Sequence, residues 1–153
     1  MTKTAGRDET RAAVDDIARN CLSLGLRRLN RVVSGMYDDA LRPLGIKVSQ
    51  MNILVVAEKL GLARPAEICR LLDLDVSTLS RNVERMRAKG WLETVAEKDA
   101  RSHPCRVTSK GRKLLADAYP AWRTAQQKAA EILGREGVAF LKGSATHGPR
   151  QGG

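Results

Sequence analysis

The sequence has few of the residues that metal sites and nucleophilic catalysis need. It contains 3 cysteines and 2 histidines in 153 residues, and none of them stands in a Cys-x-x-Cys or Cys/His ligand spacing. An odd number of isolated cysteines (Cys21, Cys69, Cys105) fits neither a disulfide framework nor a zinc site. We expect them to be small buried hydrophobic residues or incidental surface thiols. The sequence predicts no metal, no cofactor and no enzymatic activity.

Long apolar segments and aromatic residues are also scarce. No apolar run approaches the roughly 18 residues of a membrane-spanning helix, and the N-terminal MTKTAGRDETR lacks the apolar core of a signal peptide. These absences predict a cytoplasmic protein that does not enter a membrane. Aromatic residues make up 3% of the chain, and we expect Trp91 and Trp122 in the core.

Positive charge is abundant. The formal net charge is +10 and the sequence pI is about 10.1. A balance this basic favours a polyanionic partner, nucleic acid first and an anionic membrane surface second. The hydrophobic fraction of 42% argues against general disorder. A chain of this length most simply forms one domain with a sizeable core.

The first part of the chain has the apolar spacing of one long helix, from Arg11 to about Arg42, after a flexible segment at residues 1–10. Its apolar residues form two stripes, turned by roughly a third of a revolution at 100° per residue. One stripe contains Val14, Ile17, Cys21 and Leu24; the other contains Leu22, Leu26, Leu29, Val33, Met36 and Ala40. A helix with two apolar faces must be covered twice, and we expect a second subunit to supply one cover.

Three shorter helices are predicted next. Pro43 and Gly45 end the long helix; Ser49 caps a helix from Gln50 to Leu60, and Pro65 opens another from Ala66 to Leu72. The fourth lies in LDVSTLSRNVERMRAKGW, with Asp75 as N-cap and Gly90 as the left-handed residue after its end. Its apolar stripe is Val76, Leu79, Val83 and Met86. Two short helices joined by Asp73-Leu74 are the helix-turn-helix pattern.

A β-hairpin and further helices follow. Two short β runs, Trp91 to Val95 and Cys105 to Thr108, flank the polar AEKDARSHP, which predicts a hairpin with a projecting loop, called a wing. Thr108 is expected to cap a helix from about Ser109 to Leu133, which Pro120 should kink or break. A last short helix is predicted from Glu136 to Leu141, and residues 142–153 are expected to be disordered.

This order of elements resembles the MarR family of winged helix-turn-helix transcriptional regulators. Three segments carry the resemblance: ALRPLGIKVSQMNIL, LDVSTLSRNVERMRAKGWLE, and KDARSHPCRVTSKGRKLL with its Asp99-x-Arg101 pair and Thr-x-x-Gly. It covers about residues 12 to 141. The resemblance implies a mainly α fold with a small β-hairpin wing (α+β) in one domain, residues 11–141. The winged helix-turn-helix would occupy about residues 46–108, and dimerisation helices about 11–42 and 109–141.

The fourth helix is the expected reader of DNA, because a helix fits the major groove and its N-terminal residues reach the base edges. Ser77 and Thr78 are short hydroxyl groups that allow close approach. Arg81 can make a bidentate contact to guanine O6 and N7. Asn82 can reach adenine or a phosphate, and Arg85 is placed for a phosphate.

The alternative interpretation is that these polar residues are an ordinary solvated face. The distribution of charge argues against it. From Val76 to Lys113 there are ten Lys or Arg residues and four Asp or Glu residues, which places a net +6 of the chain's +10 in this segment. A winged-helix protein meets DNA with this part of the chain, so we favour DNA as the partner.

The wing supplies the remaining candidates. Arg101 is expected to enter the minor groove, where a narrow groove concentrates negative potential. Candidate phosphate contacts are Lys98, Ser102, His103 and Lys110, although Lys98 and His103 can equally be simple exposed wing residues. Asp99 would repel phosphate, and by the resemblance it pairs instead with a nearby arginine and holds the shape of the wing.

The resemblance also implies a homodimer that reads a palindromic operator. Such regulators are usually repressors released by a small, often aromatic or phenolic, ligand through a shift between two dimer geometries. Two alternatives stay open. One is a thiol-based sensor using Cys21, which has Arg19 near it but lies in an apolar stripe. The other is an architectural DNA-binding protein that senses nothing.

Overall fold

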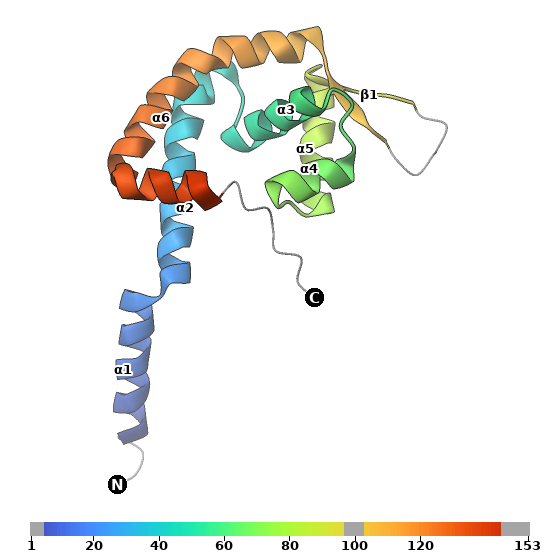
Figure 1. Ribbon diagram of the computed structural model, residues 1–153. Helices are drawn as coiled ribbons and strands as arrows, with labels where there is room; N and C mark the ends of the chain where they lie inside the picture. The colour runs from blue at the N-terminus through green and yellow to red at the C-terminus, as the bar shows by residue number, and fades with distance from the viewer. Residues whose placement is uncertain (1–4, 97–102, 145–153) are drawn as a thin grey trace. The chain divides into compact units, whose positions relative to one another are not determined.

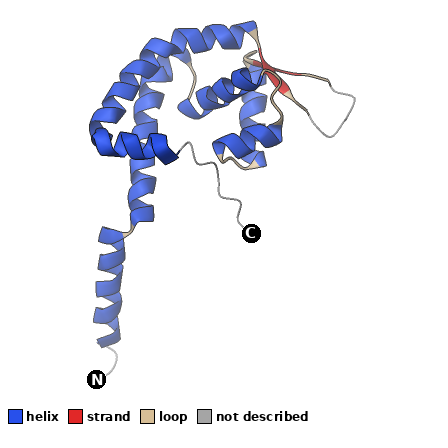
Figure 2. Ribbon diagram, viewed as in Figure 1, coloured by secondary structure: helices blue, strands red, loops and turns tan. Residues whose placement is uncertain are grey.

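The computed structural model describes residues 5–96 and 103–144 and has the predicted fold class, mainly α with one antiparallel hairpin (Figures 1 and 2). The elements are α1 (Ala5–Asn20), α2 (Leu22–Leu41), the 3-10 turn η1 (Arg42–Leu44), α3 (Val48–Leu60), α4 (Pro65–Leu72), α5 (Val76–Ala88), β1 (Leu92–Thr94), β2 (Cys105–Val107) and α6 (Ser109–Ser144). They fall into two compact units, Met1–Gly35 and Met36–Gly153. None of the described helices has both the length and the apolar character needed to cross a bilayer.

Unit 1 differs from the single helix predicted from Arg11. Helix α1 already begins at Ala5, so residues 5–10, expected to precede the helix, are part of it. Asp8 in the first turn favours this start, because a negative charge stabilises the N-terminal end of the helix dipole. The helix is interrupted at Cys21, where the apolar residues change face.

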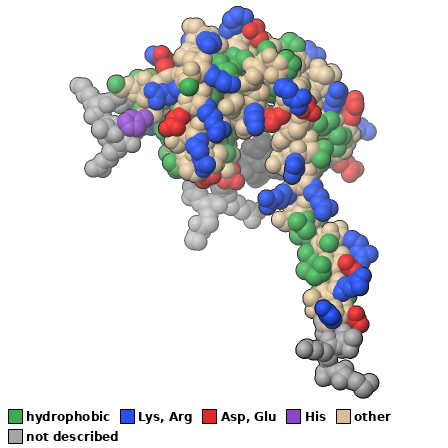
Figure 3. Space-filling model, turned by 180° about the vertical axis from the view of Figure 1, so that it is seen from behind, with side chains coloured by type: hydrophobic (Ala, Val, Ile, Leu, Met, Phe, Trp, Pro, Cys, Tyr) green, Lys and Arg blue, Asp and Glu red, His purple; other side chains and the backbone are tan. Residues whose placement is uncertain are grey.

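The two apolar stripes of unit 1 lie on its surface. Leu22 is 83% exposed, and Val14, Ile17 and Leu26 are each more than half exposed. Figure 3 shows hydrophobic side chains between charged ones along the N-terminal helix. A single chain therefore leaves these stripes uncovered.

Unit 2 begins with the end of α2 and the turn into α3. Leu41 is fully buried, and Gly45 adopts a left-handed conformation (φ 67°) after η1, as Pro43 and Gly45 predicted. The predicted cap Ser49 is not the N-cap of α3, because the helix begins one residue earlier, at Val48. The Val48 N–H instead donates to Asp38 Oδ1 at 2.8 Å, and the Lys47 N–H donates to Gln50 Oε1 at 3.2 Å.

The core of unit 2 joins α3, α4, α5 and the hairpin. Pro65 occupies the first turn of α4 as predicted, and Asp73 (φ 51°) ends that helix in the left-handed conformation. The largest fully buried side chains include Leu41, Ile53, Leu54, Ile68, Leu79, Met86 and Val107. Trp91 is also buried, as expected, whereas Trp122 is only half-buried and packs at the edge of this core. The α4–α5 pair is thereby held on the rest of the unit, and one face of α5 is left outside.

The hairpin is anchored at its base. Strand β1 pairs with β2 in antiparallel register, with Leu92 opposite Val107 and Thr94 opposite Cys105. Cys105 also exchanges two backbone hydrogen bonds of 2.9 Å with Ala63, in the α3–α4 connection. Its thiol is buried, and burial raises its pKa, so this cysteine is a structural and unreactive residue.

Helix α6 starts and bends at identifiable residues. Thr108 Oγ1 accepts the Gly111 N–H at 3.1 Å, which confirms Thr108 as the cap. Within α6 the non-helical dihedrals belong to Gly134 (φ 67°, ψ 173°) and not to Pro120. Proline has a φ compatible with a helix, whereas only glycine adopts a positive φ at little cost. The helix after Gly134 continues to Ser144, so residues 142–144 are helical and not disordered.

The middle of α6 is also tied to the end of α2. The Tyr37 hydroxyl on α2 donates to Gln126 Oε1 on α6. Desolvation by burial raises the pKa of Tyr37, which keeps its hydroxyl protonated as a donor.

Candidate nucleic-acid interface

Helix α5 begins with a network around one carboxylate. Asp75 is the N-cap, as predicted, and its Oδ1 accepts the Thr78 N–H at 2.7 Å. The same carboxylate accepts the Ser77 hydroxyl at 2.6 Å and the Thr78 hydroxyl at 2.7 Å. These hydrogen bonds, Ser77 first, hold the pKa of Asp75 well below its ordinary value. The first turn of α5 is therefore fixed around an ionised aspartate.

One face of α5 is buried against the core, and the opposite face is exposed. Leu79 and Met86 are buried, as the apolar stripe predicted, and Val83 packs partly against the core. Val76 departs from the prediction, because its side chain is 70% exposed. It stands in the first turn, ahead of the region where α5 meets the core, so the stripe reaches the core only from Leu79 onward.

The five residues of α5 that are predicted to contact DNA differ in exposure. Ser77, Arg81 and Arg85 are exposed, whereas Thr78 and Asn82 are half-buried. Arg81 folds back along the helix, with Nε donating to the Ser77 carbonyl and Nη2 to Ser77 Oγ, both at 3.2 Å. Asn82 Nδ2 donates to the Thr78 carbonyl at 3.0 Å. The structure thus brings all five residues onto one helix, with Asn82 at the margin of its outer face.

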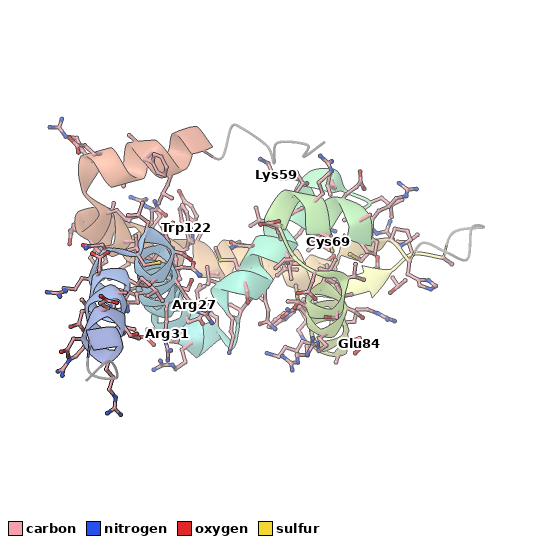
Figure 4. All side chains as sticks on the ribbon, turned by 90° about the horizontal axis from the view of Figure 1, so that it is seen from below. Arg27, Arg31, Lys59, Cys69, Glu84 and Trp122 are labelled. Atoms are coloured by element: carbon pink, nitrogen blue, oxygen red, sulfur yellow. The ribbon has the colours of Figure 1, made fainter. Side chains whose placement is uncertain are left out.

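Three further polar residues on the exposed side of α5 were not among the candidates. They are Ser80, Glu84 and Arg87, all exposed. At 100° per residue Glu84 lies beside Ser77, whereas Ser80 and Arg87 lie on the flank between Glu84 and the apolar stripe. Figure 4 shows Glu84 at the outer edge of α5. The same periodicity that located the buried stripe could have identified them, since none of the three falls on the stripe itself.

Only some of the candidate residues of the wing lie among the described residues. Lys98, Asp99, Arg101 and Ser102 lie outside the described residues, so their assigned roles stay predictions. His103 is exposed and lies two residues before the start of β2. At the base of the hairpin an exposed ion pair joins Arg106 Nη2 and Glu93 Oε1 at 2.8 Å across the two strands.

Apart from Arg81, which bonds within α5, and Lys98 and Arg101, which lie outside the described residues, the basic residues of this segment form two groups. Four are tied to other parts of unit 2: Lys89 to the Gly45 carbonyl (2.7 Å) and the Trp91 ring, Arg106 to Glu93, Arg112 to Glu58 and the Val107 carbonyl, and Lys113 to Asp117. Arg85, Arg87 and Lys110 are exposed, and the described residues offer them no ion pair. Lys110 lies over Gly90, at the end of α5. These three cations are available to an external anion.

A separate pocket of about 360 Å³ lies between α3 and α6. It is lined by Met51, Asn52, Val55, Leu115, Tyr119 and Trp122. The Tyr119 and Trp122 rings stack at 5.8 Å between centroids and 18° between planes. Among the described lining residues none is charged, so the pocket suits a flat apolar molecule.

No metal-binding arrangement occurs in the part of the chain that the structure describes: no group of three or more His, Cys, Asp or Glu residues is placed to hold an ion. Of the three cysteines, Cys21 and Cys69 are half-exposed and unpaired to any disulfide. Figure 4 marks Cys69 on α4.

Comparison with known proteins identifies relatives of this chain. A family model described as the MarR family matches residues 44–102. The crystal structure of the Mycobacterium tuberculosis transcriptional regulator MOSR in complex with DNA is 32% identical, with a TM-score of 0.70; the match covers 84% of this chain and 98% of that one. A mutant of Escherichia coli MarR complexed with operator DNA has the same fold, at 21% identity and a TM-score of 0.75, covering 86% and 96% of the two chains.

Sequence comparison alone also identifies a MarR protein as a relative. The multiple antibiotic resistance protein MarR of Salmonella typhimurium is 26% identical over 83 residues, which is 53% of this chain. The matched region spans 58% of the length of that relative.

Proposed function

Because this chain belongs to the MarR family of transcriptional regulators, we propose that it is a homodimeric repressor that binds a palindromic operator and releases it when a small aromatic or phenolic molecule binds. Regulators of this family bind DNA and are not enzymes. In this proposal the winged helix-turn-helix is residues 46–108. The helices before and after it form the dimerisation region.

The exposed face of α5 is the observation that carries the proposal. It presents Ser77, Arg81 and Arg85 outward while Leu79 and Met86 hold the helix on the core. In the major groove, Arg81 would read a base and Arg85 a phosphate, with Thr78 and Asn82 at the margins. Lys98, Ser102, His103 and Lys110 would contact phosphates, and Arg101 would enter the minor groove.

The uncovered stripes of unit 1 support the proposed dimer. Leu22, Leu26 and their neighbours expose more apolar surface than a monomer usually leaves in water. A second copy of the chain would cover it, using the same surface of both subunits around a two-fold axis. Such symmetry matches a palindrome, because each winged helix then reads one half-site.

The pocket between α3 and α6 is our candidate for the effector site. It lies between a helix of the DNA-binding part and a helix of the proposed dimerisation region, so a ligand there would favour one arrangement of the two over the other. Stacking on Trp122 and Tyr119 and one hydrogen bond from Asn52 would hold an aromatic ring with a hydroxyl group. Phenol should therefore quench tryptophan emission, and Trp122→Leu should abolish the quenching.

A thiol switch at Cys21 is the alternative that one observation favours. Cys21 is half-exposed and interrupts the helix between α1 and α2, so an oxidised sulfur there would act on the proposed dimer surface. Structures of oxidised and reduced forms of E. coli MarR share the fold of this chain. Peroxide should then release DNA from the wild type and not from Cys21→Ser; equal release from both would exclude this role.

Selection of bound duplexes from a random pool tests the proposed function itself. A dimeric repressor should enrich a palindrome whose half-sites are separated by about one helical turn. An architectural protein would enrich no defined sequence. That result would remove the repressor proposal and leave only general DNA binding.

A further inference from the structure

The hydroxyl protons of Ser77 and Thr78 are both used within the protein. Ser77 Oγ donates to Asp75 Oδ1 and Thr78 Oγ1 donates to Asp75 Oδ2. An ionised carboxylate only accepts hydrogen bonds, so each of these bonds must contain the hydroxyl proton. A free serine or threonine can offer a base either a proton or a lone pair; these two offer only lone pairs.

Arg81 also donates a hydrogen bond to Ser77, so the hydroxyl oxygen of this residue acts as an acceptor within the protein. Arg81 Nη2 donates to Ser77 Oγ at 3.2 Å, so this oxygen already acts as an acceptor as well as a donor to Asp75. A hydroxyl oxygen has two lone pairs, and one remains for an external donor. Ser77 is exposed and can present it to a bound duplex.

A third acceptor lies on the same face, two turns further along α5. Glu84 is exposed, and within the described residues it forms no ion pair, although Arg81 stands only three positions before it. Arg81 bonds to Ser77 instead. A carboxylate on a surface that meets phosphates weakens general affinity, so its place here is explained if it accepts a hydrogen bond from a base.

We propose that Ser77, Thr78 and Glu84 select bases that present an exocyclic amino group in the major groove, adenine N6 or cytosine N4. Asp75 is the positioning residue that imposes this choice on Ser77 and Thr78. These amino groups are the hydrogen-bond donors of the major groove, whereas guanine O6 and N7 and thymine O4 are acceptors. Three acceptors on α5 match the first set and repel the second. The inference rests on the proposed reading of DNA by α5.

Asp75→Asn tests the role of the carboxylate while keeping the cap, since asparagine caps helices as well as aspartate does. Its Oδ1 replaces the oxygen that accepts the Thr78 N–H, and its Nδ2 then faces Thr78 Oγ1 and donates to it. The Thr78 proton becomes free to point outward. Sites selected by Asp75→Asn should therefore admit guanine or thymine at one position per half-site, where the wild type admits adenine or cytosine.

Base analogues locate the interaction at one atom. Replacing the selected adenine by nebularine, or the selected cytosine by pyrimidin-2-one, removes only the amino group. Wild-type affinity should fall at least about fivefold, the lower end of what one mismatched base pair costs. Thr78→Val has nearly the same shape without the hydroxyl and should lose this sensitivity at its position. Thr124→Val, at an exposed threonine of α6, is the matched control and should keep it.

Glu84→Gln tests the third acceptor independently of Ser77 and Thr78. Glutamate accepts from cytosine N4, whereas glutamine can bond adenine N6 and N7 together. The variant should shift one position of the selected site from cytosine to adenine. Thermal unfolding of each variant shows whether it folds. The measurement with base analogues uses the wild-type protein and does not depend on any variant.

The outcomes separate this inference from the proposed function. If the wild type enriches no palindrome, the proposed function fails and the inference fails with it. If it enriches a palindrome but tolerates amino-free analogues throughout, or if Asp75→Asn and Thr78→Val keep the wild-type preference, the inference is overturned while the repressor proposal stands. Amino-dependent binding that both variants alter supports it.

Discussion

Gly111 lies directly against the backbone of Trp91. A Cβ atom at position 111 would overlap the Trp91 carbonyl oxygen and stand 2.7 Å from Cγ1 of Val107. Beside this contact, the Thr108 hydroxyl donates to the Gly90 carbonyl at 2.6 Å. The first turn of α6 is thereby packed onto the turn between α5 and β1. The end of α5 and the start of α6 are fixed against each other at this point.

Gly111→Ala should destabilise the protein, because the Trp91 backbone and the buried Val107 cannot move aside without disturbing the hairpin. We expect a loss of about 2 kcal/mol in the free energy of unfolding, as for other overpacked sites. Urea denaturation measures it. Gly35→Ala is the control, since a Cβ there meets nothing within 4 Å and alanine favours a helix. Equal stability of Gly111→Ala and wild type would contradict the close contact.

Arg81 should determine base preference and not general affinity. Arg81→Lys keeps the positive charge but loses the planar fork that bonds guanine O6 and N7 together. We expect discrimination at one position per half-site to fall by about tenfold or more, with affinity for random duplex nearly unchanged. Competition between the selected site and its single-base variants measures this. A uniform loss on all sequences would make Arg81 a phosphate contact.

Arg85 should contribute to affinity through phosphates. With about three phosphate contacts per subunit, the logarithm of the binding constant should fall with the logarithm of salt concentration with a slope near −5, from about −0.9 per phosphate. Arg85→Ala should make the slope shallower by about 2, because a dimer contains two copies, and should leave site preference intact. Arg123→Ala, on the exposed side of α6, should leave the slope unchanged. A wild-type slope near −1 would mean that the basic surface does not follow the duplex.

The cap of α5 predicts a pH dependence of stability. The folded-state pKa of Asp75 is lowered by its hydrogen bonds to Ser77 and Thr78. Its stabilisation is therefore complete above the unfolded-state pKa of about 4 and is lost as the pH falls below that value toward the folded pKa. The gap in unfolding free energy between wild type and Asp75→Ala should be constant from pH 5 to 7 and narrow below about pH 4. A gap that widens in acid would contradict this assignment.

Local features of the sequence predicted the DNA-binding part well. Asp75, Pro65, Thr108 and Gly90 act through neighbours within a few residues, so their types alone identify where helices begin and end. The buried positions Leu79 and Met86 followed from helical periodicity. These are contacts that a single segment specifies.

Part of what the sequence did not reveal depends on residues far apart along the chain. The α3 start uses Asp38, ten positions before the Val48 N–H it caps, so a nearby serine looked like the better cap. The Ala63–Cys105 bridge joins segments that only the fold brings together. Val76 fits the periodicity but lies ahead of the region where α5 meets the core. The direction in which the hydroxyl protons of Ser77 and Thr78 point could be inferred only from the atomic positions in the structure.

The central claim is that two copies of this chain read a palindrome through α5 and the wing. It is tested most directly by sedimentation of the full chain with the selected duplex and with a scrambled duplex of equal length and composition, at physiological salt. We predict two chains per selected duplex and an affinity at least about 10³-fold above that for the scrambled one. One chain per duplex, or equal affinity for both, would contradict the account.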